Sequence, residues 1–328
     1  MKDKIRWGIL ATGIIAGKFA KGLSVLDDAE LFAVGSRKKK TAEDFAQKFG
    51  VQRAYPSYEE LAKDKDVDVI YISSLHPFHM ENTILCLGEG KAVLCEKPFA
   101  MNAQQTRKMI ELAGKQKVFL MEAMWTRFIP VVVKVREILK QGLIGQVRFL
   151  HINFGCRMEW DPMHRLFNPE LGGGALLDVG VYCVSFASMV FGKAPSKISS
   201  MAHIGSTGVD EHSVFILGYD KGPMAVLTSA LSTNTVKEAV LSGTKGAIRI
   251  GEPFFYPTRA VISIEGQDEQ VIEIPLEGNG YNYEAQEVMD CMRAGKLESD
   301  TMPLNETLEI IETMDKIRAQ WNLKYTVE

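Results

Sequence analysis

The sequence predicts an α/β protein: a Rossmann-type, doubly wound parallel sheet, then an α+β domain with an open, mostly antiparallel sheet. Two observations support this fold class. Through residue 122, near-continuous apolar runs alternate with amphipathic helical stretches, which is typical of parallel strands covered on both faces. From residue 197 onward, strand signals dominate and are separated by Gly, Asp and Asn. We therefore expect a dinucleotide-binding domain at 1–123 and a substrate-binding domain at 124–328.

The amino-terminal part contains five expected strands joined by helical stretches. Helical spacing is clearest at 41–49 and 103–114. This βαβ rhythm predicts a parallel sheet between two layers of helices. The expected strands are the apolar runs at 5–11, 31–36, 67–74, 92–97 and 117–123.

The rest of the chain begins with a helix, a strand and a long polar loop, and it ends with two helices. We expect the helices within 281–321 to pack back toward the amino-terminal domain, and Gly295 is in a natural position to end the first of them. The expected helices lie at 131–142, 175–192, 281–295 and 305–321; the expected strands lie at 147–155, 197–204, 214–219, 224–231, 238–243, 247–250, 260–265 and 270–276.

Composition limits the possible partners. The chain has 328 residues, 46% hydrophobic and 24% charged, with a formal net charge of −3. This balance is typical of a soluble globular protein and offers no excess of cations for nucleic acid or a membrane surface. We expect no apolar run that approaches the roughly 18 residues of a membrane span. From the charge balance we expect a small-molecule substrate. No signal peptide is visible after Met1, so we expect a cytoplasmic location.

Cysteine and histidine usage argues against metal binding. The five cysteines are odd in number and scattered, which suggests neither disulfides nor a zinc site. His76 and His79 are three residues apart, but no cysteine or carboxylate nearby completes a ligand set. We therefore expect no metal.

A relaxed dinucleotide-binding turn follows the first strand. The segment A-T-G-I-I-A has alanine at the first glycine position, so we expect negative φ at Ala11. Gly13 remains where the backbone must approach a pyrophosphate, and Ala16 suits the third, small position. The alternative is a plain tight turn. The expected cofactor contacts are Ala11, Thr12, Gly13, Ile14 and Ile15.

Cations follow the second strand, where an NAD site would place an acidic residue. Ser36, Arg37 and Lys38 stand there, and the next helix is expected to start with Thr41 as its cap. Cations before a positive helix end are unfavourable unless an anion binds. A 2′-phosphate is the obvious anion, so we expect NADP(H) to be preferred over NAD(H). The alternative is a solvated basic turn.

The segment K-A-V-L-C-E-K-P places Lys97 at the carboxyl end of a buried strand. In α/β proteins that edge of the sheet binds ligands. The expected role of Lys97 is therefore functional, and the alternative is a surface lysine at the start of a loop.

A second unusual segment has three glycines ahead of a helix that carries Asp178 and Tyr182. These two residues are four apart and share a helical face. A positive charge about 4 Å away is worth roughly 4 kcal/mol at an effective dielectric of 20, enough to lower the pKa of a phenol by about 3. We hypothesise that Lys97 activates Tyr182 and that Asp178 holds the lysine charged. The alternatives are a core tyrosine and an aspartate that bonds backbone amides.

Together, these segments resemble the glucose-fructose oxidoreductase and inositol 2-dehydrogenase (Gfo/Idh/MocA) family. The resemblance is closest to the branch of dimeric dihydrodiol dehydrogenases and NADP-dependent D-xylose dehydrogenases. It covers essentially the whole chain and is carried by A-x-G-x-x-A, C-E-K-P, L-H-P-F-H, M-E-A-M-W-T-R-F and G-G-G-A-L-L-D-V-G-V-Y-C-V.

The resemblance implies roles for individual residues. It puts Lys97 beside the nicotinamide and makes Tyr182, with Asp178, the acid/base, where the broader family commonly has histidine. It also implies a tightly held NADP(H), a substrate bowl under the open sheet and a homodimer built through that sheet. Further cofactor contacts are implied at Ser74, Leu75, His76, His79, Glu96 and Lys97, and substrate contacts at Trp125, Arg127, Phe154 and Tyr182.

Two of these roles have alternatives, and two segments depart from the branch. His79 is explained nearly as well by capping the next helix, and Arg127 by an interdomain salt bridge. The departures are Gly155–Pro169 and Gly278–Tyr281, where substrate-facing loops are expected. The substrate is therefore left open.

The predicted function is NADP(H)-dependent hydride transfer involving a sugar, a vicinal diol or a related carbonyl compound of the trans-dihydrodiol or D-xylose type. The alternative is a catalytically idle NADP(H)-binding sensor of the same fold. Binding of nucleic acid through residues 37–40 is disfavoured by the net charge.

Overall fold

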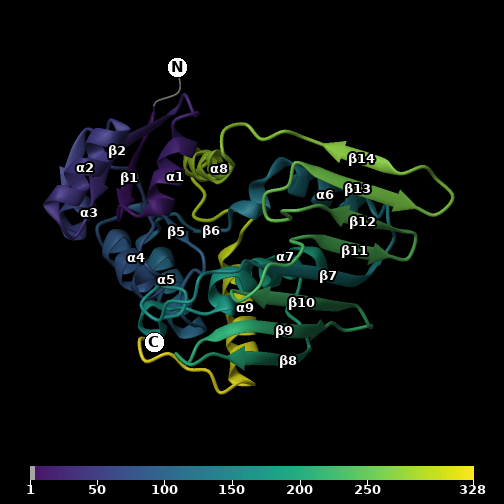
Figure 1. Cartoon of the computed structure of the whole chain (residues 1–328). Helices are drawn as coiled ribbons and strands as arrows, with labels where there is room; N and C mark the ends of the chain where they lie inside the picture. Colours follow the sequence, from purple (N-terminus) through teal and green to yellow (C-terminus); the bar gives the residue numbers. More distant parts are fainter. Residues whose placement is uncertain (1–3) are drawn as a thin grey trace. The chain divides into compact units, whose positions relative to one another are not determined.

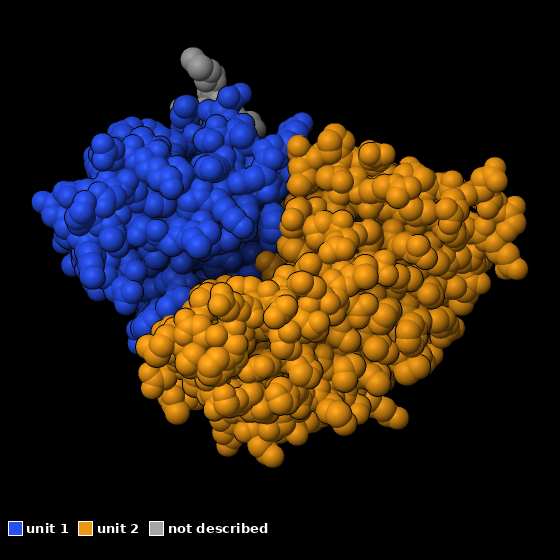
Figure 2. Space-filling view, in the orientation of Figure 1, with its two compact units in different colours: residues 1–100, 104–125, 277–307 blue, residues 101–103, 126–276, 308–328 orange. Residues whose placement is uncertain are grey.

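A computed structural model describes residues 4–328, and the chain divides into two compact units (Figure 2). Unit 1 is built from residues 1–100, 104–125 and 277–307. Unit 2 is built from residues 101–103, 126–276 and 308–328. Both units are therefore discontinuous in sequence.

Unit 1 contains a parallel sheet of six strands in the order β3-β2-β1-β4-β5-β6 (Figure 1). The strand order reverses between β1 and β4, which is where ligands bind in such sheets. The central strands β4 and β5 are buried at every position, as expected for strands covered on both faces. The strands are β1 (Ile5–Leu10), β2 (Ala29–Gly35), β3 (Arg53–Tyr55), β4 (Val69–Ile72), β5 (Ala92–Glu96) and β6 (Leu120–Ala123).

Helices connect these strands, and the side chains between helices and sheet form the core. Fully buried residues such as Leu10, Ile70, Val93 and Leu120 belong to that core. The connecting elements are α1 (Ile14–Leu23), α2 (Lys39–Phe49), α3 (Tyr58–Ala62), η1 (His76–Phe78), α4 (His79–Gly88) and α5 (Ala103–Gln116).

A segment from near the carboxyl terminus completes unit 1. Helix α8 (Tyr281–Arg293) packs against α1, where a Cβ on Gly22 would lie 2.7 Å from Oδ1 of Asn279. The Asn279 side chain donates to the Lys18 carbonyl at 2.8 Å, and Arg293 pairs with Asp28 at 2.8 Å. A glycine is needed at position 22 because any side chain would push α8 away.

Unit 2 contains a sheet of eight strands in the order β14-β13-β12-β11-β7-β10-β9-β8. Every neighbouring pair is antiparallel except β7 with β10, so the predicted mostly antiparallel sheet is confirmed. The strands are β7 (Val147–Gly155), β8 (Lys197–Ile204), β9 (Asp210–Gly218), β10 (Met224–Ala230), β11 (Ala239–Gly243), β12 (Gly246–Ile250), β13 (Arg259–Ile264) and β14 (Gln270–Glu273).

The other elements in this part of the chain are helices and helical turns. One is a π-turn, η4, at the point where the sequence predicts a continuous helix over 175–192. They are η2 (Trp125–Phe128), α6 (Pro130–Gln141), η3 (Pro169–Leu171), η4 (Leu176–Gly180), α7 (Val181–Phe191) and α9 (Leu304–Ala319).

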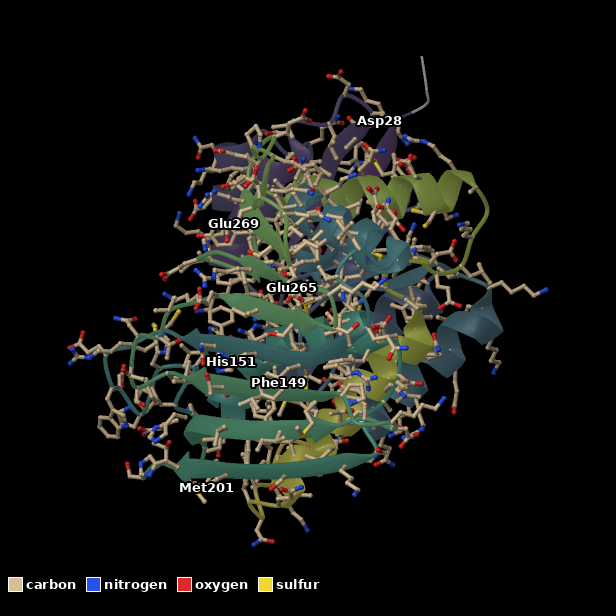
Figure 3. The ribbon with its side chains drawn as sticks, turned by 90° about the vertical axis from the view of Figure 1, so that its right-hand side faces the viewer. Asp28, Phe149, His151, Met201, Glu265 and Glu269 are labelled. Atoms are coloured by element: carbon tan, nitrogen blue, oxygen red, sulfur yellow. The ribbon has the colours of Figure 1, made fainter. Side chains whose placement is uncertain are left out.

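The two faces of this sheet differ. Along β7, Leu150, Ile152 and Phe154 are buried, and Phe149 on the opposite face is exposed. Phe149 pairs with Met224, and Val214 pairs with Met201. Cross-strand partners share a face of the sheet, so the two members of each pair lie on the same face. Figure 3 shows Phe149, His151 and Met201 on this open face. The open face thus carries several exposed apolar side chains.

One segment corrects the expectation about apolar runs. Within the described residues, Pro169–Phe191 is long and apolar enough to cross a membrane by length and composition. However, 78% of its apolar window is buried inside the protein. A buried core helix passes the same test, so the finding is weak evidence for a membrane span.

Candidate active site

The turn after β1 leaves the first amides of α1 open to a ligand. Gly13 is the N-cap, no side chain caps the helix, and the first turn has no acidic residue. A Cβ at Gly13 would meet nothing within 4 Å. Open amides at a positive helix end suit a pyrophosphate, so this turn fits a dinucleotide.

The expectation of negative φ at Ala11 is wrong. Ala11 has φ +79°, in the left-handed region, and its amide donates to the Gly35 carbonyl at 3.0 Å. The turn therefore keeps the geometry of a glycine turn, and alanine accepts the strain of about 1–2 kcal/mol that left-handed backbone costs.

The basic segment after β2 differs from its prediction in one respect. Helix α2 begins at Lys39, and Lys38 is its extended N-cap, so Thr41 lies inside the first turn instead of capping it. The Thr41 hydroxyl donates to the Lys38 carbonyl at 2.8 Å and lies 2.6 Å from Ser36 Oγ. The first turn has no acidic residue and no side-chain cap, so the unfavourable run of cations remains.

The cations of this run have different neighbours. Lys39 and Lys40 form i,i+4 ion pairs with Glu43 and Asp44 on the helix surface. Arg37 lies beside Tyr58, where burial raises the pKa of the phenol and the guanidinium partly offsets that rise.

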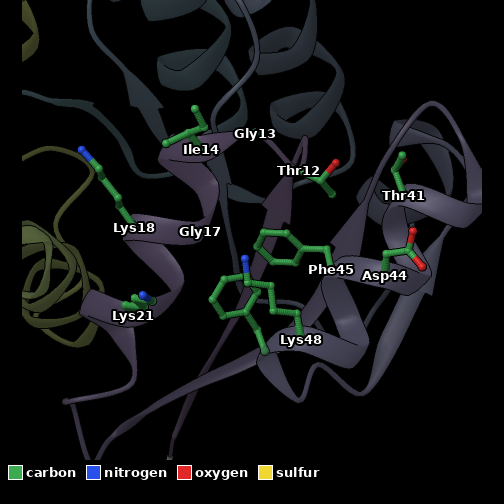
Figure 4. Close-up of a pocket in the computed structure, with 11 residues that line it drawn as sticks. Thr12, Gly13, Ile14, Gly17, Lys18, Lys21, Thr41, Asp44, Phe45 and Lys48 are labelled. Atoms are coloured by element: carbon green, nitrogen blue, oxygen red, sulfur yellow. The ribbon is translucent and has the colours of Figure 1, made fainter.

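A cavity of about 530 Å³ opens beside the turn, within unit 1 (Figure 4). Its size is in the range of small-molecule pockets. The sequence reasoning predicted Thr12, Gly13 and Ile14 here but missed the other lining residues. These are Gly17, Lys18, Lys21, Thr41, Asp44, Phe45, Lys48 and Phe49.

His79 has two backbone partners, and its predicted cofactor contact stays a prediction. Its ring is fully buried, with Nδ1 2.9 Å from the Pro98 carbonyl oxygen and Nε2 3.0 Å from that of Ser74. Burial lowers its pKa. His79 therefore links the chain ends of β4 and β5. Ser74 and Leu75 are partly buried in this segment, and His76 is largely buried.

Strand β5 ends at Glu96, and Lys97 follows it. The Tyr71 hydroxyl donates to Glu96 Oε1, and the Lys97 amide donates to Glu96 Oε2 at 3.1 Å. The sequence reasoning missed a second carboxyl group that interacts with Glu96, that of Glu284 in α8. Glu284 is fully buried, and its pKa lies well above the ordinary value because of burial and the charge of Glu96.

In unit 2, Asp178 lies in η4 and Tyr182 lies in the first turn of α7. An ion pair joins Asp178 Oδ1 to Arg165 Nη1 at 2.9 Å, a partner that the sequence reasoning missed. Tyr182 lies among aromatic rings: its centroid is 5.5 Å from both Phe154 and Phe255, which stack at 4.4 Å. Phe154 was predicted here, and Phe255 was not.

Lys97 belongs to unit 1, and Asp178 and Tyr182 belong to unit 2. Their joint action on one substrate stays a prediction.

Trp125 and Arg127 have well-defined neighbours inside their own units. Trp125 stacks on Tyr281 at 4.4 Å within unit 1. Arg127 is buried in unit 2, where it donates to Ser185 Oγ at 3.2 Å and to the Ser185 carbonyl at 2.7 Å. These bonds tie Arg127 to α7, and its predicted substrate contact stays a prediction.

The glycine cluster before η4 is held by buried polar groups. A Cβ on Gly174, whose φ is +111°, would lie 2.4 Å from Asp210 Oδ1. The other oxygen of Asp210 accepts from the Leu176 amide at 2.7 Å, and burial raises the pKa of this carboxyl to about 7. The Tyr325 hydroxyl donates to the Gly173 carbonyl at 2.6 Å.

A parallel sheet whose first turn presents open helix amides is typical of dehydrogenases that bind a nicotinamide dinucleotide. Comparison with known proteins agrees. A family model described as "Oxidoreductase family, NAD-binding Rossmann fold" matches residues 5–124, and "GFO/IDH/MocA C-terminal domain" matches residues 132–249. The protein is an NAD(P)-dependent oxidoreductase of the dehydrogenase class. More specifically, the chain belongs to the GFO/IDH/MocA family, as the sequence motifs predicted.

Curated relatives match over nearly the full chain. The trans-1,2-dihydrobenzene-1,2-diol dehydrogenase of Mus musculus is 42% identical over 325 residues, which cover 96% of each chain. The Xenopus tropicalis protein of the same name is 40% identical and covers 98% of this chain and 99% of its own.

Solved structures share the fold at lower identity. An aldose-aldose oxidoreductase from Caulobacter crescentus aligns with a TM-score of 0.89 at 22% identity, over 96% of this chain and 97% of its own. KijD10, a 3-ketoreductase from Actinomadura kijaniata in complex with NADP, aligns with a TM-score of 0.86 at 22% identity, over 97% and 98%.

Proposed function

We propose that the protein is an NADP(H)-dependent oxidoreductase for a vicinal diol, a sugar or a related carbonyl compound, of the trans-dihydrodiol or D-xylose type. The observation that carries the proposal is the setting of Tyr182, a phenol among aromatic rings that follows an ion-paired aspartate on the same helical segment. The similarity to dihydrodiol dehydrogenases, at about 40% identity over nearly the whole chain, supports the diol substrate class.

The proposed roles divide the proton chemistry among three side chains. A bound nicotinamide supplies or accepts the hydride. Tyr182 Oη accepts the proton of the substrate hydroxyl during oxidation and returns it to the carbonyl oxygen during reduction. Lys97 stabilises the phenolate and orients the substrate oxygen, and Asp178 supports this charge arrangement. The rings of Phe154 and Phe255 keep water from the reacting atoms.

The preference for NADP(H) is supported by the segment after β2. No acidic residue stands at the end of β2 for a ribose hydroxyl; the chain has Ser36, Arg37 and Lys38 there. The uncapped start of α2 adds a positive helix end to these cations. The turn at Ala11–Ile15 and the strand ends at Ser74–His76 and Glu96–Lys97 are proposed to contact the rest of the cofactor.

The test is Tyr182→Phe. The loss of the acid/base should lower kcat by about 10²–10⁴-fold, with NADPH affinity within about twofold of wild type. Steady-state kinetics on a panel of dihydrodiols, aldoses and dicarbonyls, with both cofactors, measures the first quantity, and NADPH fluorescence titration measures the second. Tyr219→Phe, which removes another buried hydroxyl of unit 2, is the matched control.

Two results contradict the proposal. Near-normal turnover by Tyr182→Phe removes the tyrosine from the mechanism. NADPH binding by wild type without turnover on any member of the panel favours the sensor.

We also propose that the protein is a cytoplasmic homodimer. The exposed apolar side chains on the open face of the unit 2 sheet support association through that face. The five cysteines are free thiols and four of them are buried, which is compatible with a reducing compartment.

A further inference from the structure

Arg165, in the segment Gly155–Pro169 where the chain departs from the related branch, forms an ion pair with Asp178. Arg165 Nη1 and Asp178 Oδ1 are 2.9 Å apart, and the side chains are 42% and 12% exposed. A cation at this distance favours the ionised carboxylate. The Asp178 side chain is mostly buried, so the pair acts chiefly on the ionisation of this carboxylate.

The backbone that carries Arg165 is fixed against the glycine cluster. The Gly174 amide donates to the Leu166 carbonyl at 2.8 Å, and the Gly173 amide donates to the Asn168 carbonyl at 3.0 Å. A Cβ on Gly173 would lie 2.7 Å and 2.8 Å from the carbonyl oxygens of Leu166 and Arg165. Glycine is therefore required for this close approach.

Side-chain burial fixes the same segment from the other side. Leu166 and Phe167 are buried immediately after Arg165. Asp178 is held in turn, because its amide donates to the Gly174 carbonyl at 3.2 Å. Both partners of the ion pair are thus anchored to one rigid glycine segment.

We propose that Arg165 is a positioning residue that keeps Asp178 ionised and oriented for the proton transfer at Tyr182. The inference rests on the proposed function for its catalytic meaning, but the ion pair itself exists without it. The sequence reasoning made Asp178 hold Lys97 charged, but it named no residue that keeps Asp178 itself ionised.

Other charged and titratable groups around Asp178 define what else can shift its ionisation. Cys156, which follows β7, interacts electrostatically with Asp178, Lys237 and Glu252. Lys237 and Glu252 form an ion pair with each other at 3.2 Å. Tyr182 follows on the same helical segment, and Lys97 is the proposed partner from unit 1. Arg165 is in direct contact with the carboxylate, at 2.9 Å.

The first experiment follows Asp178 directly and needs no substrate. Protein labelled with ¹³C at the aspartate carboxyl carbons is titrated by NMR, and the Asp178 signal is identified by its loss in Asp178→Asn. Arg165→Ala should raise the midpoint of that signal by about one pH unit. Arg165→Lys, which keeps the charge but loses the planar fork, should raise it less. Arg157→Ala, which removes another exposed arginine from the same loop, should leave it unchanged.

The second experiment measures kcat/KM against pH with a substrate that the wild type turns over. The acidic limb should move upward by about one pH unit in Arg165→Ala and stay in place in Arg157→Ala. An unchanged NMR midpoint in Arg165→Ala, or in Arg165→Lys and Arg165→Gln if the alanine variant does not fold, overturns the proposal. A shifted midpoint with an unmoved acidic limb overturns the catalytic role of the pair. Wild type that is inactive on every substrate defeats the proposed function instead, and the NMR result then still decides whether Arg165 sets the ionisation of Asp178.

Discussion

Burial sets the protonation state of Glu284. Neither of its carboxyl oxygens has a hydrogen-bond partner among the described residues, and Glu96 contributes a like charge nearby. Its pKa is raised well above 4.5 in the folded protein. Between the ordinary carboxyl pKa and the raised one, the folded state holds a proton that the unfolded state has released, so stability falls as pH rises through this window.

Glu284→Gln should remove this dependence. The stability that Glu284 contributes is fully present below about pH 4.5 and declines above it, by about 1.4 kcal/mol per pH unit up to the folded-state pKa. The variant should therefore lose less stability than wild type between pH 5 and pH 8. Urea unfolding at several pH values measures the difference. Parallel curves for the two proteins would show that Glu284 is ionised in the fold.

Arg37 is the residue on which the NADP(H) preference depends most. A bidentate, charge-assisted contact with a 2′-phosphate is worth about 1.5–3 kcal/mol. Arg37→Ala should thus lower the affinity for NADPH by about 10–100-fold and leave the affinity for NADH nearly unchanged. Fluorescence titration measures both affinities. Lys40→Ala, which removes a cation already paired with Asp44, is the control. Equal losses of affinity for NADPH and NADH would mean that the 2′-phosphate binds elsewhere.

At the scale of elements, periodicity predicted most of the fold. The five expected strands of unit 1 form because their apolar runs are continuous and buried on both faces. Strand β3 (Arg53–Tyr55) was missed because it has three half-buried residues and no apolar run. Periodicity does not separate a π-turn from an α-helix, so η4 was also not predicted. The N-cap of α2 is Lys38, three residues before the predicted Thr41, and no capping side chain marks this start in the sequence.

Sequence reasoning selected site residues that follow a strand or a glycine turn, and their roles stay predictions. Lys97, Asp178 and Tyr182 were chosen in this way. Arg165 and Phe255 were missed because their contacts depend on tertiary packing, which local patterns do not report. Glu284 had a signal: with Tyr281, Ala285 and Val288 it occupies the buried face of α8 at helical spacing, so an acid on an apolar face marked the position.

At the scale of the whole molecule, the open sheet face determines the expected oligomer. Ile216 and Met224 are exposed by about two fifths on the strands β9 and β10. Ile216→Glu combined with Met224→Glu should convert the dimer to a monomer, because two like charges would face their symmetry mates. Light scattering should give about twice the 36.5 kDa chain mass for wild type and the chain mass for the variant.

The control for the open face is Val236→Glu, which adds a charge at an exposed loop position and should remain dimeric. A monomeric wild type, or a dimer that tolerates both glutamates, would exclude association through this face.

The discontinuity of unit 1 determines the order in which a nascent chain acquires its structure. Residues 1–125 leave the ribosome with the surface of α1 around Gly22 uncovered, because α8 follows only after residues 126–276. At about 5–20 residues per second, that interval lasts on the order of 10 s. During synthesis, unit 1 therefore remains incomplete until α8 has been made.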